Sequence, residues 1–222
     1  LLRDLAVFYT VNINHEIYKK KLNKLLIDFE NLSKDICPKI SFLKLEIDQI
    51  PEIYKGPLDN YFSALGVNKN NFFTDISNYL SYETGQPTHC YDANKINGKL
   101  VFKEVERQED FETLLDKKIS LSEKNPVFLL NNEIVNLAGV VGGKSTACSI
   151  NTKTVIVECA FFQPEAIIGK SVKYDIQSEA SHKFERGVDP ECHDRVLRRF
   201  IKIVKDHVNI NEMSIISYKY KD

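Results

Sequence analysis

The stretch between Thr74 and Asp92 brings hydroxyl, amide, carboxylate and imidazole groups close together along the chain. Ser77 and Asn78 fall in the first turn of a predicted helix, and His89 follows a Gly-Gln-Pro turn on a segment that can fold back. The three side chains can then meet in one small site at the start of the helix. From this stretch alone the simpler interpretation is favoured, in which Asn78 caps the helix and His89 is an ordinary surface histidine.

A short helix is expected to hold these groups. Its apolar residues recur at the i, i+3, i+4 spacing of one helix face, which is the spacing of Ile76, Tyr79 and Leu80. Thr74 or Asp75 is the expected N-cap, and Gly85 is the expected C-terminal stop.

The most strand-like run of the chain covers residues 154–162 and contains one charged side chain, Glu158. Side chains alternate between the two faces of a strand, so Glu158 shares a face with Ile156 and Ala160. It is then either exposed to solvent or buried in a pocket, where the carboxyl must be protonated or accept hydrogen bonds. The strand alone favours the exposed position.

Three glycines, Gly139, Gly142 and Gly143, follow a predicted strand and have two interpretations. They form a turn and a bulge, or they let a ligand approach the main chain closely. They match neither the dinucleotide-binding G-x-G-x-x-G pattern nor a P-loop, so nucleotide binding at this point is not supported.

A hydrolytic triad of Ser181, His182 and Asp189 is a further possibility, and it is disfavoured. No G-x-S-x-G elbow surrounds the serine. Adjacent Ser and His residues on one segment do not easily hydrogen-bond as nucleophile and base.

Composition narrows the class of protein. The 222 residues are 43% hydrophobic and carry 30 basic and 31 acidic side chains, so the net charge of −1 offers no general attraction for nucleic acid. Five scattered cysteines without a C-x-x-C pair disfavour a disulfide framework or a zinc site. No apolar run is long enough to span a membrane. Because the chain begins with leucine, we expect a fragment of a larger protein.

The pattern of elements predicts an α+β fold with a mainly antiparallel sheet or a closed β-barrel as its core, flanking helices and a long C-terminal helix. Residues 1–36 are expected to be helical in two pieces, the first from Leu2 to Tyr9, and their lysine cluster is interpreted as a solvated helix face. The C-terminal helix is expected to start near Asp189. Further elements are predicted at 43–47 and 214–218 (strands), 58–65 (helix), and 127–130 with 134–139 (a hairpin turning at Asn131 and Asn132).

Five motifs occur in a fixed order along the chain: DISNY at 75–79, GQPTHCYD at 85–92, LAGVVGG at 137–143, VECAFF at 157–162 and EASHKFERGVDP at 179–190. Together they resemble the editing region of the bacterial-type phenylalanyl-tRNA synthetase β subunit. The resemblance implies that residues 37–222 are the editing domain and that residues 1–36 are the end of a preceding domain and a linker helix.

The resemblance also implies a function, which is hydrolysis of tyrosine wrongly attached to tRNA(Phe). The parent enzyme of such a fragment is a cytoplasmic α2β2 ligase that uses ATP and Mg²⁺. The partners would be tRNA(Phe) and the synthetase α subunit, with no membrane contact. No cofactor or metal is expected in this fragment. The alternative is a tRNA- or subunit-binding module whose editing activity has decayed.

Site residues follow from the same resemblance. Glu158 would accept the tyrosine hydroxyl, and the small residues Gly139, Gly142 and Ala180 would form the walls around the aromatic ring. The expected hydrolytic residues, which would hold the terminal adenosine and orient water, are Ser77, Asn78 and His89. The sequence departs from the family pattern at Ser77, where threonine is usual, and at 178–180, where Ser-Glu-Ala replaces Thr-Asp-Ala.

Overall fold

Strand β11 (Thr154–Phe161) lies inside the first of two five-stranded sheets in the computed structural model, which describes residues 16–176 and 178–220. It pairs antiparallel with β3 (Lys39–Ile47) on one side and with β4 (His89–Asp92) on the other. Beyond β3 the sheet continues through β12 (Ile210–Lys219) to β1 (Asn23–Lys24). The strands predicted at 43–47, 154–162 and 214–218 are therefore confirmed.

The second sheet has the order β10-β9-β8-β5-β2, with bounds Val141–Gly142, Glu133–Leu137, Lys124–Leu130, Leu100–Glu106 and Phe29–Asn31. The predicted hairpin is confirmed between β8 and β9, where Asn131 and Asn132 have φ angles of 50° and 73°. A small third sheet pairs β6 (Glu109–Glu112) with β7 (Lys118–Leu121). Two 3₁₀ turns, Ala93–Lys95 and Lys144–Thr146, lie in the connections.

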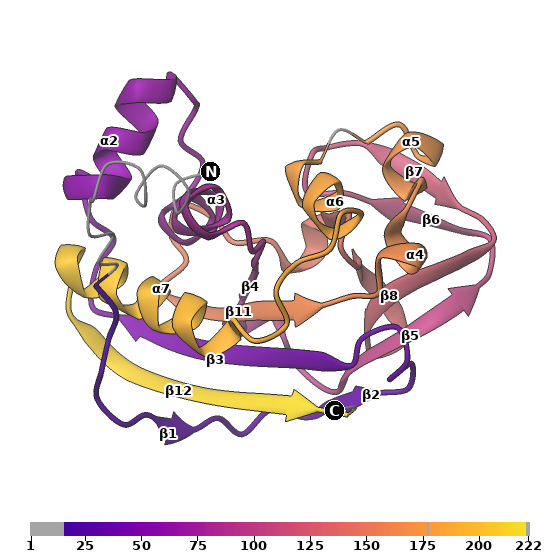
Figure 1. Cartoon of the computed structure of the whole chain (residues 1–222), viewed down its shortest axis with the longest axis horizontal. Coiled ribbons are helices and arrows are strands. Elements are labelled where there is room, and N and C mark those ends of the chain that lie inside the picture. Colours follow the sequence, from indigo (N-terminus) through magenta and orange to yellow (C-terminus); the bar gives the residue numbers. More distant parts are fainter. Residues whose placement is uncertain (1–15, 177, 221–222) are drawn as a thin grey trace, which may run out of the picture.

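Helices cover the outer face of the first sheet. Figure 1 shows α3 (Phe72–Thr84) and α7 (His193–His207) over this face, with α2 (Gly56–Leu65) beside them. The short helices α4 (Pro164–Ile167), α5 (Lys170–Lys173) and α6 (Glu179–Phe184) gather near the second sheet. In the described ranges no helix is long and apolar enough to cross a membrane.

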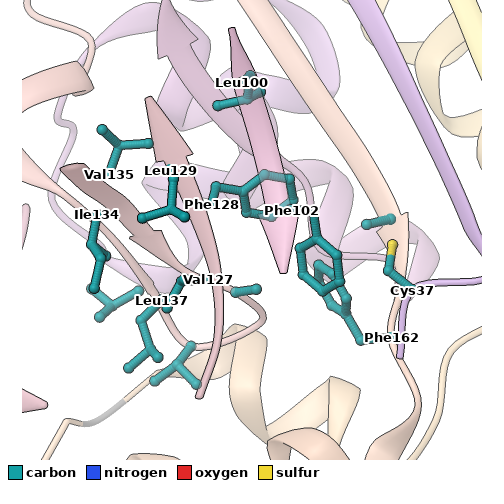
Figure 2. Packing of buried hydrophobic residues seen from close by; sticks show 14 of the residues in the cluster. Cys37, Leu100, Phe102, Val127, Phe128, Leu129, Ile134, Val135, Leu137 and Phe162 are labelled. Carbon is teal, nitrogen blue, oxygen red and sulfur yellow. The ribbon is translucent and has the colours of Figure 1, made fainter. Parts of the chain in front are cut away.

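Because the side chains of β11 alternate, the strand contributes to two cores. Val155, Val157 and Cys159 pack in a cluster with the helices, whereas Ile156 and Ala160 belong to the cluster between the two sheets. Figure 2 shows that second cluster around the strands of the second sheet. The predicted α+β class with antiparallel sheets is confirmed.

Helices α3 and α7 are joined by a shielded ion pair. The Arg199 guanidinium donates to both carboxylate oxygens of Glu83 at 3.0 Å, and both side chains are less than a tenth exposed. Tyr79 donates to the same carboxylate at 2.6 Å. This bidentate geometry fixes α3, and therefore Ser77 and Asn78, relative to the sheet under α7.

Two predictions about helix ends are wrong. Helix α3 begins one turn earlier than expected, because the Asn71 side chain accepts a hydrogen bond from the Thr74 amide and is the N-cap; the C-terminal stop at Gly85 is confirmed, with φ 79°. Helix α7 begins at His193, because the Asp189 side chain instead accepts from the Glu191 amide in a preceding turn.

The predicted linker helix is also wrong over residues 16–36, while its first piece, Leu2 to Tyr9, lies outside the described residues. The backbone of this segment pairs with the edges of both sheets: β1 runs parallel to β12, and β2 runs parallel to β5. Leu25 is buried, but its neighbour Leu26 is 88% exposed. The backbone of this segment therefore forms hydrogen bonds with edge strands of the two sheets, and not within the helix that the apolar periodicity predicted.

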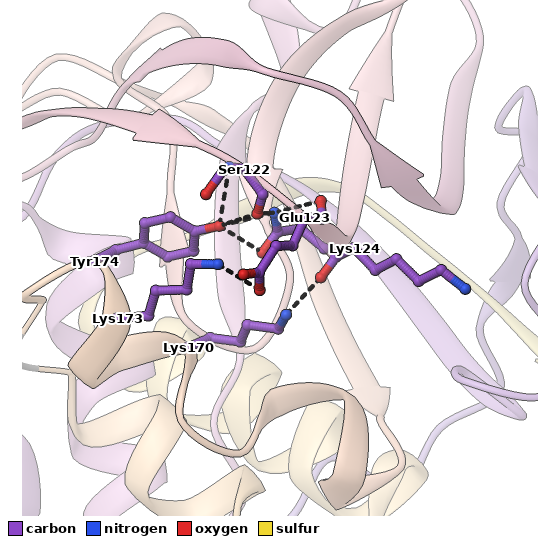
Figure 3. Close-up of polar contacts among 7 residues, drawn as sticks. Ser122, Glu123, Lys124, Lys170, Lys173 and Tyr174 are labelled. Carbon is purple, nitrogen blue, oxygen red and sulfur yellow. Dashed lines mark hydrogen bonds and ion pairs between the residues drawn. The ribbon is translucent and has the colours of Figure 1, made fainter.

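The closed-barrel alternative is wrong for the described part of the chain. The first sheet ends at β1 and β4, and the second ends at β10 and β2, so neither sheet closes on itself. Short elements seal the far side of the second sheet instead. Figure 3 shows the Tyr174 hydroxyl after α5 bonded to Ser122, beside the ion pair of Lys173 with Glu123 and the hydrogen bond from Lys170 to the Lys124 carbonyl. Asn125 Nδ2 also donates to the Tyr174 hydroxyl, at 2.9 Å.

Replacing Phe102 with alanine is expected to lower the free energy of unfolding by about 3–5 kcal/mol, because a cavity opens in the inter-sheet core. Phe102 is fully buried, and its ring centroid lies 5.1 Å from that of Phe128 and 5.6 Å from that of Phe162. The exposed Leu26→Ala variant is the control and should change stability by less than about 0.5 kcal/mol. Urea unfolding measures both, and equal effects would contradict the described core.

Candidate functional site

A cavity of about 530 Å³ opens between α3, β4, the β9–β10 turn, β11 and α6. It is large enough for an amino-acid ester. All seven residues named from the sequence line it, although they come from separate parts of the chain: Ser77, Asn78, His89, Gly139, Gly142, Glu158 and Ala180.

Glu158 is buried, with 4% of its surface exposed, so the exposed position favoured by the strand pattern is wrong. Its side chain points from β11 to the face that packs on the second sheet. The Tyr91 hydroxyl donates to its Oε2 at 2.6 Å, and Asn136 Nδ2 lies 3.4 Å from the same oxygen. Burial raises the pKa of Glu158 to about 8, and the Tyr91 hydrogen bond opposes that rise.

His89 occupies the position of β4 directly opposite Glu158, so both side chains are on the same face of the sheet. Its ring stands edge-on to Tyr91, with centroids 4.4 Å apart. Nε2 is buried and has no hydrogen-bond partner among the described residues. Burial lowers the pKa of His89 to about 4, so the imidazole is neutral at pH 7.

The two glycines keep the cavity open in different ways. A Cβ on Gly142 would lie 2.1 Å from His89 Cε1, so any side chain there would displace the imidazole. Gly139 has φ +70°, and a Cβ there would lie 2.8 Å from Ile167 Cδ1. Both glycines therefore make room for neighbouring side chains as well as for the cavity.

The site residues on and near α3 differ in whether their polar groups already form hydrogen bonds. The Ser77 hydroxyl donates to the Thr88 carbonyl at 2.7 Å and ties α3 to the segment before β4. Asn78 is exposed, and its side-chain amide has no hydrogen bond within the described ranges. Ala180 is half-buried in the first turn of α6.

Two polar residues of the site were missed. Tyr91 is fully buried, and Asn136 on β9 is 4% exposed; Asn136 Nδ2 donates to the Tyr91 hydroxyl at 2.8 Å. The sequence does contain a signal for Asn136, because it stands, like Glu158, as one polar side chain inside a strongly apolar strand. Such a residue is buried with a partner or marks a solvent face.

The disfavoured triad is not assembled. The Ser181 hydroxyl is buried and donates to the Ser178 carbonyl at 2.9 Å, whereas His182 and Asp189 are exposed. Across the described residues there is also no group of three or more side chains placed to hold a metal ion.

Residues 56–209 match the model of the B3/4 domain. The chain belongs to the B3/4 domain family. This match covers α2 to the end of α7 and includes every element that lines the cavity.

Curated relatives of this B3/4 domain confirm the resemblance seen in the motifs. The phenylalanine–tRNA ligase beta subunit of Ehrlichia canis (strain Jake) is 35% identical over 161 residues, which are 72% of this chain and 20% of that protein. The subunit of the same name from Neisseria meningitidis serogroup B (strain MC58) is 37% identical over 139 residues, 63% of this chain and 18% of that protein. The chain thus spans about a fifth of the length of these relatives.

A solved structure shares the fold of this B3/4 domain. An N-terminal fragment of the phenylalanyl-tRNA synthetase beta subunit from Pyrococcus horikoshii superimposes with a TM-score of 0.53. The match covers 95% of this chain and 58% of that one at 11% sequence identity, so it supports the architecture alone.

The raised pKa of Glu158 predicts a pH-dependent cost of folding. In the unfolded chain this carboxyl ionises above its ordinary pKa of 4.5, whereas in the folded protein it holds its proton up to about pH 8. The folded state binds more protons in this window, so stability falls as pH rises from about 4.5 to about 8. Glu158→Gln removes that dependence, and its stability relative to the wild type should rise by a few kcal/mol across the window.

Urea unfolding of both proteins at several pH values measures the difference. The exposed Glu165→Gln variant controls for the loss of a carboxyl at the surface. A stability difference between Glu158→Gln and the wild type that stays constant from pH 4.5 to 8 would contradict the raised pKa.

Proposed function

We propose that the cavity hydrolyses tyrosine from misacylated tRNA(Phe), as the editing site of a phenylalanine–tRNA ligase. The observation that carries this proposal is the burial of Glu158 at the wall of a cavity that is large enough for an amino-acid ester. A buried carboxyl is costly to maintain, and a ligand that donates a hydroxyl to it offsets part of that cost.

Selection for tyrosine over phenylalanine needs an acceptor of this kind. An apolar pocket rejects an added hydroxyl poorly, by about a hundredfold, so a second site that recognises the hydroxyl supplies the remaining discrimination. Phenylalanine would leave one oxygen of Glu158, the one that neither Tyr91 nor Asn136 contacts, without a donor, which costs about 1–3 kcal/mol relative to tyrosine. A second site of this kind therefore binds the tyrosyl product, which must be removed, more tightly than the correct phenylalanyl product.

Hydrolysis in this proposal rests on positioning more than on strong base catalysis. With its pKa lowered to about 4, His89 is a neutral but weak base in the lining of the cavity, where it would help to orient water. Ser77 and Asn78, which lie in the second turn of α3 and not in its first turn as the sequence predicted, would hold the terminal adenosine. An aminoacyl ester is already activated, so an oriented water suffices as the co-reactant.

The parent protein is part of the same proposal. The full subunit would pair with a synthetase α subunit and bind tRNA(Phe) in the cytoplasm. ATP and Mg²⁺ would serve aminoacylation elsewhere in that enzyme, and the editing reaction would use neither. The alternative remains a tRNA- or subunit-binding module without hydrolytic activity, and the experiment below separates the two.

Glu158→Ala and His89→Ala are each expected to slow deacylation of Tyr-tRNA(Phe) by about tenfold or more in the intact synthetase that carries this chain. The first removes the acceptor of the tyrosine hydroxyl, and the second removes the group that holds water. The exposed Glu165→Ala and His182→Ala variants are the matched controls. Charging of tRNA(Phe) with phenylalanine should be unchanged in all four.

Rates are measured on preformed Tyr-tRNA(Phe) after subtraction of spontaneous hydrolysis. Undiminished deacylation by either site variant would contradict the role proposed for that residue. If the wild-type enzyme leaves Tyr-tRNA(Phe) intact, the non-hydrolytic alternative holds.

A further inference from the structure

Tyr91 and Asn136 converge on one of the two oxygens of Glu158. Tyr91 Oη donates to Oε2 at 2.6 Å, and Asn136 Nδ2 donates to Tyr91 Oη at 2.8 Å and lies 3.4 Å from Oε2. The other oxygen, Oε1, receives no hydrogen bond among the described residues, while Glu158 borders the cavity. The two carboxylate oxygens therefore have different surroundings.

The direction of the hydrogen bonds in this cluster is fixed by chemistry. The amide nitrogen of Asn136 is a donor only, so it occupies an acceptor position of the Tyr91 hydroxyl. That hydroxyl is then free to donate to Oε2, which stays an acceptor whether or not Glu158 is ionised. Because Oε2 accepts from Tyr91, Oε1 carries the proton of the neutral carboxyl, and it becomes an acceptor for a ligand hydroxyl when that proton leaves to solvent.

The three side chains come from three strands, and this makes the arrangement rigid. Glu158 lies on β11, Tyr91 on the adjacent β4, and Asn136 on β9 of the second sheet. All three are less than a tenth exposed. The cluster thus bridges the two sheets at the wall of the cavity.

We propose that Tyr91, held by Asn136, is a positioning residue that fixes Oε2 of Glu158, so that Oε1 is the single acceptor offered to a hydroxyl-bearing ligand. The proposal rests on the function proposed above and extends it to a specificity-determining pair on β4 and β9. Tyr91 does not touch the reacting ester in this scheme; it acts through Glu158.

The environment of Glu158 supports an effect on ionisation as well as on orientation. The groups around it are His89 and Tyr91 from β4, Asn136 from β9, and the thiols of Cys37, Cys90 and Cys159. No cation is among them. The Tyr91 hydrogen bond is the interaction that lowers the pKa of Glu158 against the rise caused by burial, so losing it raises the pKa further.

Tyr91→Phe tests the proposal, because it removes one oxygen and keeps the ring. In the intact synthetase we expect kcat/KM for Tyr-tRNA(Phe) deacylation to fall about tenfold, equivalent to about 1.4 kcal/mol. The acid limb of the pH–rate profile should move to higher pH. The matched control is Tyr174→Phe, which also loses a buried hydroxyl bonded to an asparagine but lies outside the cavity.

A double-mutant comparison separates positioning from a general structural effect. If Tyr91 acts only through Glu158, then adding Tyr91→Phe to Glu158→Ala, which leaves Tyr91 no side chain to position, should cause no further loss of kcat/KM. Equal losses in both backgrounds, or a Tyr91→Phe enzyme that matches Tyr174→Phe in rate and pH profile, would overturn the proposal.

A ligand-free crystal structure of the Tyr91→Phe protein decides the question without any activity. We expect the Glu158 carboxylate to leave its wild-type position or to occupy a second rotamer. An unmoved carboxylate would overturn the positioning role even in an active enzyme. A moved carboxylate in a protein that does not hydrolyse Tyr-tRNA(Phe) would support the positioning role while the proposed function fails.

Discussion

The structure depends on the burial of one carboxyl group, that of Glu158, in the middle of a fully covered strand. Removing such a group from water costs several kcal/mol unless it is protonated or hydrogen-bonded. The fold meets this cost with donors from a neighbouring strand and from the second sheet, Tyr91 and Asn136. This one side chain is therefore a contact point between β11, β4 and the second sheet.

Strand β11 explains why a cavity lies at this place. Its outer face is filled by the cluster under α3 and α7, to which β11 contributes the buried side chains of Val155, Val157 and Cys159. Its inner face carries Glu158 between Ile156 and Ala160, opposite a second sheet that presents Gly142 instead of a side chain. The space left by the absent side chain of Gly142 is occupied by the His89 ring. The site is thus a gap between two sheets, bordered by the polar residues that both sheets bury.

Sequence patterns correctly predicted the elements that are determined by residues close together in the chain. Strand β11, helix α3 with its stop at Gly85, and the Asn131–Asn132 hairpin follow from period and turn chemistry. The segment before Cys37 was misjudged, because its apolar spacing fits a helix while the free edges of two sheets compete for its backbone. The burial of Glu158 and its hydrogen bond with Tyr91 depend on which strands become neighbours, and these strands are far apart in the sequence. The spacing of apolar residues within one strand carries no information about that pairing.

Burial shifts the two titratable groups of the cavity in opposite directions. With a pKa of about 8 for Glu158 and about 4 for His89, both side chains are mainly uncharged at neutral pH. These two side chains therefore offer no fixed charge to a ligand, and the hydrogen-bonding groups of the ligand distinguish one ligand from another. A ligand that donates a hydroxyl to Glu158 stabilises the carboxylate and lowers its pKa, so binding and ionisation are coupled. A phenyl ring brings no donor and leaves the carboxyl protonated. The cavity therefore acquires a charge-assisted bond only with the ligand that carries the extra hydroxyl.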